Sequence, residues 1–331
     1  MDSKKNILWI NYLKAVSILG VFFVHCQLYY SFWLGDVNNF IHPFYVNAFF
    51  FVSGYLLFRK QLCESFINQE IGEYVIGDGK ILWGNILWRL IIPTIIFSII
   101  EFFPSQVLRG HGFDVGTFMY KTVGGCTYWF TAALVVAELL IVGMLLTRIR
   151  NIWFYFFCSC VLFVFGQVIV SNGFSIFEQY PSLPWQYKHG LYAIVFMALG
   201  GLYWKYESFV NSLMNLYALI GMMVAYVICL VMWPEYFKVL VSMLDVNISG
   251  IVLSILSTLI LIELCKKLPS SKLLNYVGQN TICFYFMSGA LPIVIGMSAI
   301  TMALCDPILH LPFLLDTYYT TITRQSACPR R

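Results

Sequence analysis

The segment ILWINYLKAVSILGVFFVHCQLYY, residues 7–30, decides the fold class of this 331-residue chain. A helix that crosses a bilayer needs about 20 mostly apolar residues, and this segment supplies them with only Lys14 and His25 as basic side chains. It is too long for the apolar part of a signal peptide and lacks a small-residue cleavage site. We therefore predict a retained transmembrane helix.

Similar apolar runs recur along the chain. We expect further spans near residues 39–58, 83–103, 128–147, 152–170, 190–204, 213–233, 248–265 and 279–303. A tenth run, over 305–316, is short and is interrupted by Pro307 and Pro312. The sequence thus predicts an all-α polytopic membrane protein, a bundle of about nine to ten transmembrane helices. Residues 1–316 would form one helical domain, and 317–331 a polar, atypical tail.

The composition excludes most other classes of protein. The chain is 60% hydrophobic and 11% charged, whereas a soluble domain is about 45–50% apolar and about 25% charged. It cannot cover a soluble core with a polar surface. A net charge of +4, spread along the chain, is too weak to predict a nucleic-acid partner. The ten cysteines lie mostly in apolar runs and form no CxxC pair, so we interpret them as buried apolar residues.

The distribution of lysine and arginine predicts a cytoplasmic N-terminus. With that orientation, eleven basic residues fall in inner loops: Lys4, Lys5, Arg59, Lys60, Lys80, Arg148, Arg150, Lys205, Lys266, Lys267 and Lys272. Four fall in outer loops: Arg109, Lys121, Lys188 and Lys238. We expect a multi-pass protein of the inner or plasma membrane, surrounded by membrane lipids.

Ionisable side chains at bilayer depth cost at least about 2.5–3.5 kcal/mol each on insertion scales, so they are candidates for function. The candidates at this depth are Lys14, His25, Arg89, Glu101, Glu138 and Glu263. Lys14 and His25 are 11 residues apart, which places them on one face of a helix, about 16 Å apart along its axis.

The basic members of this set each have a structural alternative. The Lys14 side chain could extend to the inner lipid headgroups, and His25 could bond to a neighbouring helix. Arg89 could hold lipid phosphates or the phosphates of a cytosolic ligand.

The acidic members are also open to two interpretations. Glu138 lies mid-span and must be paired or protonated, so it either orients His25 or joins two helices. Glu101 and Glu263 lie near the ends of their spans and are interpreted as interfacial. The outer loops at 105–127 and 171–189 mix aromatic and polar residues, which favours an interfacial aromatic belt over sugar stacking.

Five blocks of the sequence resemble the membrane-bound acyltransferase family three, and they occur in the family's order. They are NYLKAVSILGVFFVH (11–25), AFFFVSGYLLFRK (48–60), WRLIIP (88–93), YWFTAALVVAELL (128–140) and LNYVGQNTICFYFMSGALP (274–292). The resemblance implies transfer of an acyl group, commonly acetyl, from cytosolic acyl-CoA to a sugar hydroxyl on the extracytoplasmic side. The acceptor would be a surface carbohydrate or a lipid-linked glycan of the cell envelope.

The resemblance also implies roles for particular residues. His25 would be the catalytic general base, and Lys14 and Arg89 would bind the donor's phosphates. The supporting residues would be Ser53, Tyr55, Trp129, Glu138, Tyr285 and Ser288. We expect acyl-CoA, with acetyl-CoA favoured, as co-substrate, and no resident cofactor or metal, since no two histidines share a helix face at ligand spacing. The oligomeric state is not predicted.

The chain differs from the family pattern at several positions. Lys14 and Ile86 stand where the family usually or often has arginine, and Ser288 stands where it commonly has histidine. Two other classes therefore remain open: a transporter or flippase of glycan precursors, and a catalytically degenerate relative. A transporter favours paired broken helices and similarity between the two halves, neither of which is evident in the sequence.

Overall fold

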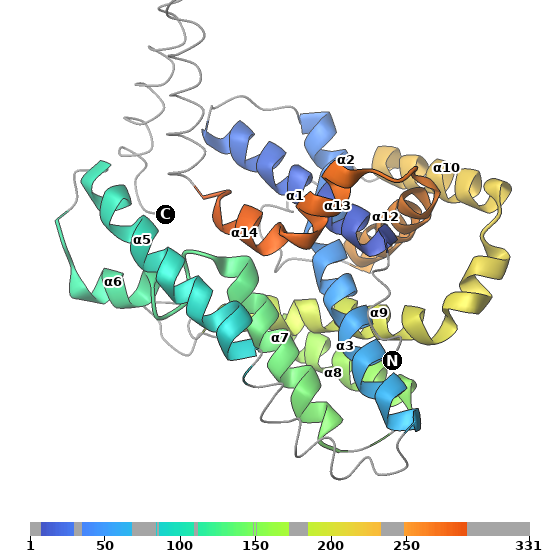
Figure 1. The fold of residues 1–331 in the computed structure, drawn as a ribbon, viewed down its shortest axis with the longest axis horizontal. Coiled ribbons are helices and arrows are strands. Elements are labelled where there is room, and N and C mark those ends of the chain that lie inside the picture. The colour runs from blue at the N-terminus through green and yellow to red at the C-terminus, as the bar shows by residue number, and fades with distance from the viewer. Residues whose placement is uncertain are drawn as a thin grey trace, which may run out of the picture.

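A computed structural model describes residues 8–29, 35–67, 84, 86–108, 112–147, 149, 151–171, 185–232 and 248–289. All regular elements in these ranges are helical (Figure 1). In chain order they are α1 (Leu8–Tyr29), α2 (Gly35–Tyr45), α3 (Asn47–Ile67), the π-helical turn η1 (Leu87–Ile91), α5 (Ile92–Leu108), α6 (Val115–Lys121), α7 (Trp129–Leu145), α8 (Ile152–Ser171), α9 (Tyr187–Leu213), α10 (Leu216–Met232), α12 (Ile248–Lys267), α13 (Lys272–Gln279) and α14 (Thr281–Phe286).

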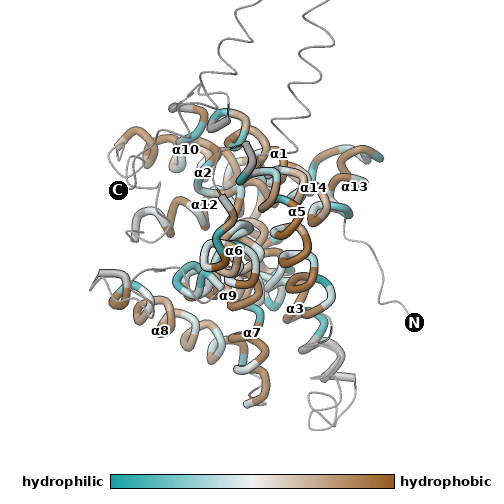
Figure 2. The backbone as a smooth tube through the Cα atoms, turned by 90° about the vertical axis from the view of Figure 1, so that its left-hand side faces the viewer, coloured by the Kyte–Doolittle hydropathy of each residue, from teal (hydrophilic) through white to brown (hydrophobic). Residues whose placement is uncertain are grey.

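Helices occupy every expected span from 7–30 to 248–265. Within the described residues, four helical stretches are long and apolar enough to cross a membrane, or five if the bent pair α9–α10 is one span. Figure 2 shows how strongly apolar residues predominate along α5 and α7. The total of nine to ten spans and the cytoplasmic N-terminus stay predictions. The chain beyond residue 289, with the expected tenth span and the tail, lies outside the described residues.

Among the described residues, helices α3 and α9 form the most extensive helix pair. A Cβ atom at Gly54 of α3 would lie 1.9 Å from the carbonyl oxygen of Met197 on α9. A Cβ atom at Gly200 would lie 2.0 Å from the carbonyl oxygen of Phe51. Only glycine allows the two backbones to approach this closely, and small residues at such crossings are typical of helix packing in membranes.

A second close crossing brings α13 against α1, although the two helices are far apart in sequence (Figure 1). A Cβ atom at Gly278 would lie 1.9 Å from the carbonyl oxygen of Asn11. The Asn11 side chain donates a hydrogen bond to Asn275 Oδ1 at 2.7 Å. At Asn280 the backbone leaves helical geometry and separates α13 from α14, and α14 lies at the start of the predicted span 279–303.

The π-helical turn η1 has its cause in Pro93. In an α-helix the N–H of residue 93 would donate to the carbonyl of Arg89, but proline has no N–H and its ring crowds that carbonyl. The chain widens instead, and the N–H of Ile92 donates to Leu87 O, five residues back. This widened turn holds Arg89 at the start of α5.

Helix α9 continues through a segment that the sequence predicted to be a loop. The expected spans 190–204 and 213–233 correspond to α9, which extends to Leu213, and to α10, which leaves at an angle of 108°. Non-helical backbone angles at Tyr206 mark a kink inside α9. The bend between α9 and α10, the kink at Tyr206 and the break at Asn280 are interruptions of helices that the sequence did not predict.

Candidate functional site

A cavity of about 210 Å³ lies among α1, α3, η1, α7 and the α13–α14 pair. Four residues that the sequence singled out line this cavity, which we call the cation pocket: Lys14, Ser53, Arg89 and Tyr285. The hydroxyl-bearing residues Thr131 and Thr281 also line it. Two basic side chains from distant parts of the chain thus share one cavity with several hydroxyl groups.

Arg89 is held at the pocket by Glu138 of α7. Its Nη2 donates hydrogen bonds to Oε1 and Oε2 of Glu138, at 2.6 and 2.9 Å. The Glu138 side chain is 5% exposed, whereas that of Arg89 is 54% exposed. Of the two roles that the sequence left open for Glu138, this contact matches the joining of two helices.

Lys14 has a different environment from Arg89. It is half-buried, and no described carboxylate forms an ion pair with it. Arg89 is close enough to repel it electrostatically. A half-buried ammonium group beside a second cation is costly unless an anion accompanies it. The pocket is therefore electrostatically suited to an anionic ligand.

His25 lies farther along α1 and contacts the end of α14. Its Nδ1 lies 2.5 Å from the backbone carbonyl oxygen of Ser288. Because a carbonyl oxygen only accepts, Nδ1 carries the hydrogen, and in the neutral ring Nε2 carries the lone pair. The Ser288 hydroxyl instead donates to Tyr285 O at 2.7 Å. The Ser288 backbone, not its side chain, therefore orients the imidazole.

The helix pair α13–α14 connects the two parts of this site. Residues 279–283 and Tyr285 line the cation pocket, while Ser288, a few residues on, bonds to His25. His25 itself does not line the cavity. Lys14 and His25 lie about 16 Å apart along α1. The site therefore has two levels, the cation pocket at Lys14 and a second level at His25, and α14 connects them.

Glu101 of α5 was not among the predicted site residues, because its place near the end of a span suggested an interfacial group. Its Oε2 atom is buried, and a Cβ atom at Gly289 would lie only 2.6 Å away from it. The carboxylate is close enough to His25 to interact with the imidazole electrostatically. The signal in the sequence that could have identified Glu101 as a site residue is the free-energy cost of placing a carboxylate at bilayer depth.

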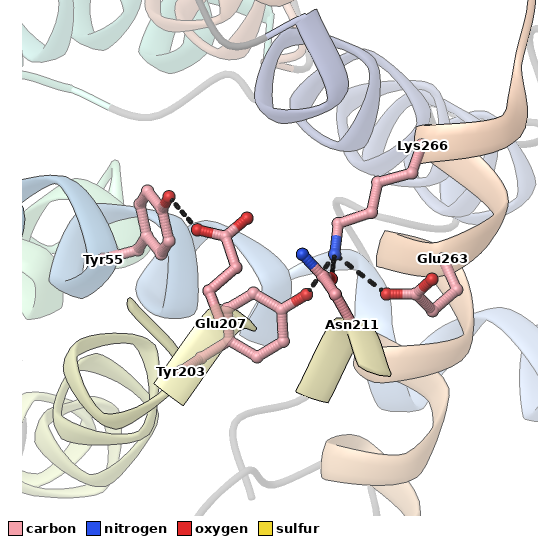
Figure 3. A network of polar contacts seen from close by, with 6 residues as sticks. All are labelled: Tyr55, Tyr203, Glu207, Asn211, Glu263 and Lys266. Atoms are coloured by element: carbon pink, nitrogen blue, oxygen red, sulfur yellow. Dashed lines mark hydrogen bonds and ion pairs between the residues drawn. The ribbon is translucent and has the colours of Figure 1, made fainter. Parts of the chain in front are cut away.

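Besides Glu138 and Ser288, two more of the predicted supporting residues, Tyr55 and Trp129, do not line the cation pocket. The Tyr55 hydroxyl donates to Glu207 Oε2 at 2.6 Å and so joins α3 to α9 (Figure 3). Trp129 packs against the His189 ring, with ring centroids 5.2 Å apart, and joins α7 to α9. Both contacts fix helices around the site.

A polar cluster around Lys266 lies beside Tyr55. Lys266 Nζ donates three hydrogen bonds, to Tyr203 OH at 2.6 Å, Asn211 Oδ1 at 2.5 Å and Glu263 Oε1 at 2.9 Å (Figure 3). Glu263 is buried by this contact, although its position near the end of a span predicted an interfacial residue. The cluster joins α9 to α12 near the kink in α9.

Among the described residues, no group of three or more histidine, cysteine, aspartate or glutamate side chains is placed to hold a metal ion.

Comparison with known proteins identifies the family. A family model described as an acyltransferase domain, that of acyltransferase family 3, matches residues 7–315, nearly the whole chain. No curated protein and no solved structure matches. The match and the apolar helices support an acyltransferase that acts in a membrane. The chain belongs to acyltransferase family 3.

Proposed function

We propose that this protein is an O-acyltransferase that moves an acyl group, with acetyl favoured, from cytosolic acyl-CoA to a hydroxyl of an extracytoplasmic or lipid-linked carbohydrate. The observation that carries the proposal is the half-buried Lys14, which has no described carboxylate counterion and shares a cavity with Arg89. The phosphates of acyl-CoA are anions of the kind that this cavity suits.

The donor's phosphates would bind in the cation pocket. A cavity of about 210 Å³ is smaller than the roughly 300–1,000 Å³ of a complete small-molecule site, so it would take only the phosphate-bearing part of the donor. The flexible arm that carries the thioester would then run along α1 toward His25. The separation of about 16 Å between Lys14 and His25 suits an extended arm of this kind.

His25 would act as general base at the second level of the site. With Nδ1–H held by the Ser288 carbonyl, Nε2 takes the hydroxyl proton of the sugar as the sugar oxygen attacks the thioester carbonyl. The new C–O bond forms, the C–S bond breaks, and the departing thiolate takes the proton from the imidazolium. The products are the sugar ester and free CoA.

The proposal is tested by mass spectrometry of the surface glycan in a strain with the gene deleted and re-supplied as variants. His25→Ala should abolish acylation while the protein level in the membrane is kept. Cys26→Ala is the matched control and should retain acylation, because Cys26 is adjacent to His25 in α1 and is similarly half-buried.

Three outcomes would contradict the proposal. Acylation that persists in His25→Ala would remove the catalytic assignment. Loss of the glycan itself from the surface, rather than of its acyl groups, would favour a transporter or flippase. A glycan unchanged by deletion of the gene would favour a catalytically degenerate relative.

A further inference from the structure

The turn at Ser288–Gly289 is a meeting point of three helices. It follows α14, its Ser288 carbonyl receives the hydrogen bond from His25 of α1, and its Gly289 packs against the carboxylate of Glu101 from α5. Gly289 is buried, and a side chain there would enter the space that the carboxylate occupies. The turn therefore places an imidazole and a carboxylate on adjacent residues of one backbone segment.

A carboxylate and a protonated imidazole near one turn attract each other. Glu101 interacts with His25 across a buried environment, where the attraction between opposite charges is stronger than in water. The other described carboxylates inside the bundle contact other groups: Glu138 pairs with Arg89, Glu207 accepts from Tyr55, and Glu263 pairs with Lys266.

We propose that Glu101 is the positioning residue of the general base, stabilising the imidazolium form of His25 during acyl transfer while the Ser288 carbonyl fixes the ring. This inference rests on the function proposed above. The positive charge exists only between the uptake of the hydroxyl proton and its delivery to the thiolate, so a fixed carboxylate acts chiefly on the transition state. Glu101 neither gains nor loses a proton in this scheme.

The expected kinetic result follows from that timing. A group that acts only in the transition state lowers kcat when removed and leaves the KM for acyl-CoA unchanged. Since positioned acid–base groups contribute about 10²–10⁴-fold, we expect Glu101→Gln to lower kcat by about 10- to 100-fold. Glu101→Asp, which keeps the charge, should recover part of the loss.

Gly289→Ala offers a test that leaves Glu101 in the protein. The new methyl group would meet the end of a flexible side chain, so the carboxylate can move aside without disrupting the backbone. We expect a fall in kcat like that of Glu101→Gln, with the thermal midpoint nearly unchanged. Glu263→Gln is the matched control, because it neutralises a buried carboxylate that contacts Lys266 instead of His25.

The assay uses membranes that contain the full-length protein, radiolabelled acetyl-CoA, and surface glycan extracted from the deletion strain. The inference is supported if Glu101→Gln and Gly289→Ala lower kcat selectively while Glu263→Gln, per folded molecule, does not. It is overturned if Glu101→Gln retains full kcat, or if all three variants lose activity only in proportion to lost folded protein. His25→Ala, measured in the same assay, separates the two proposals. If His25→Ala is fully active, the proposed function itself is refuted. If His25→Ala is inactive and Glu101→Gln is fully active, only the role of Glu101 is refuted.

Discussion

Arg89 and Glu138 form an ion pair in which the carboxylate is buried and the arginine is exposed. Arg89 Nη2 donates to both oxygens of the carboxylate, while more than half of the arginine side chain remains exposed. The pair joins η1 to α7 and fixes Arg89 at the cation pocket. Because only the acidic member is buried, removing one partner has different consequences from removing the other.

Arg89→Gln should destabilise the protein more than Glu138→Gln. The first change leaves a buried carboxylate without its cation, which costs up to about 3–5 kcal/mol in fully buried pairs, whereas the second leaves an arginine that is already half exposed. Thermal unfolding of both variants in lipid nanodiscs measures the difference.

The double variant Arg89→Gln/Glu138→Gln separates stability from donor binding. It should regain most of the thermal midpoint, because no unpaired carboxylate remains, and yet keep a raised KM for acyl-CoA. Recovery of the KM together with the midpoint would show that Arg89 serves the fold and not the donor.

Lys14→Met should raise the KM for acyl-CoA by at least about tenfold, since one charge-assisted phosphate contact is worth about 1.5–3 kcal/mol. The thermal midpoint should hold or rise, because a half-buried ammonium group without a described carboxylate is replaced by an apolar side chain of similar length. Lys14→Arg keeps the charge and should stay within a few-fold of the parent. Equal affinity of the methionine variant for the donor would argue against a phosphate site at this cavity.

Gly54→Ala should prevent the accumulation of folded protein. Its methyl group would meet the Met197 backbone at 1.9 Å, and a backbone atom cannot move aside without separating α3 from α9. Overpacking commonly costs about 1–3 kcal/mol and more where backbone must shift.

Gly143→Ala in α7 is the matched control for Gly54→Ala at the crossing of α3 and α9. Outside the local helix, no atom lies within 4 Å of the place that its new methyl group would take, so the change should be neutral or stabilise by up to about 1 kcal/mol. Size-exclusion profiles of the two variants in detergent make the comparison. A monodisperse Gly54→Ala protein with an unchanged thermal midpoint would refute the close crossing of α3 and α9.

Lys266→Met should lower the thermal midpoint, whereas Lys267→Met should not. Lys266 of α12 supplies two hydrogen bonds to α9, at Tyr203 and Asn211. It also pairs with Glu263 of its own helix, so its loss leaves that buried carboxylate without a cation. Lys267 is exposed, and exposed substitutions commonly change stability by less than about 0.5 kcal/mol. Equal midpoints for the two variants would show that the cluster in Figure 3 does not hold these helices together.

The sequence by itself determined the membrane class, the family and the positions of the first eight helical regions, because these depend on composition and local order along the chain. It also selected Lys14, Ser53, Arg89 and Tyr285, which share one cavity in the structure. The face and separation of Lys14 and His25 followed from helical geometry within a single element. Such properties need no knowledge of neighbouring helices.

Only the tertiary structure decided which side chains meet across helices. Glu138 pairs with Arg89, Glu101 lies by His25, and Tyr55 bonds to Glu207 on α9. The reason is that a polar residue in a span must find a partner, but the identity of that partner depends on where helices cross. Those crossings are set by backbone approaches such as Gly54 against Met197, which link residues far apart in the chain and leave no local pattern in the sequence.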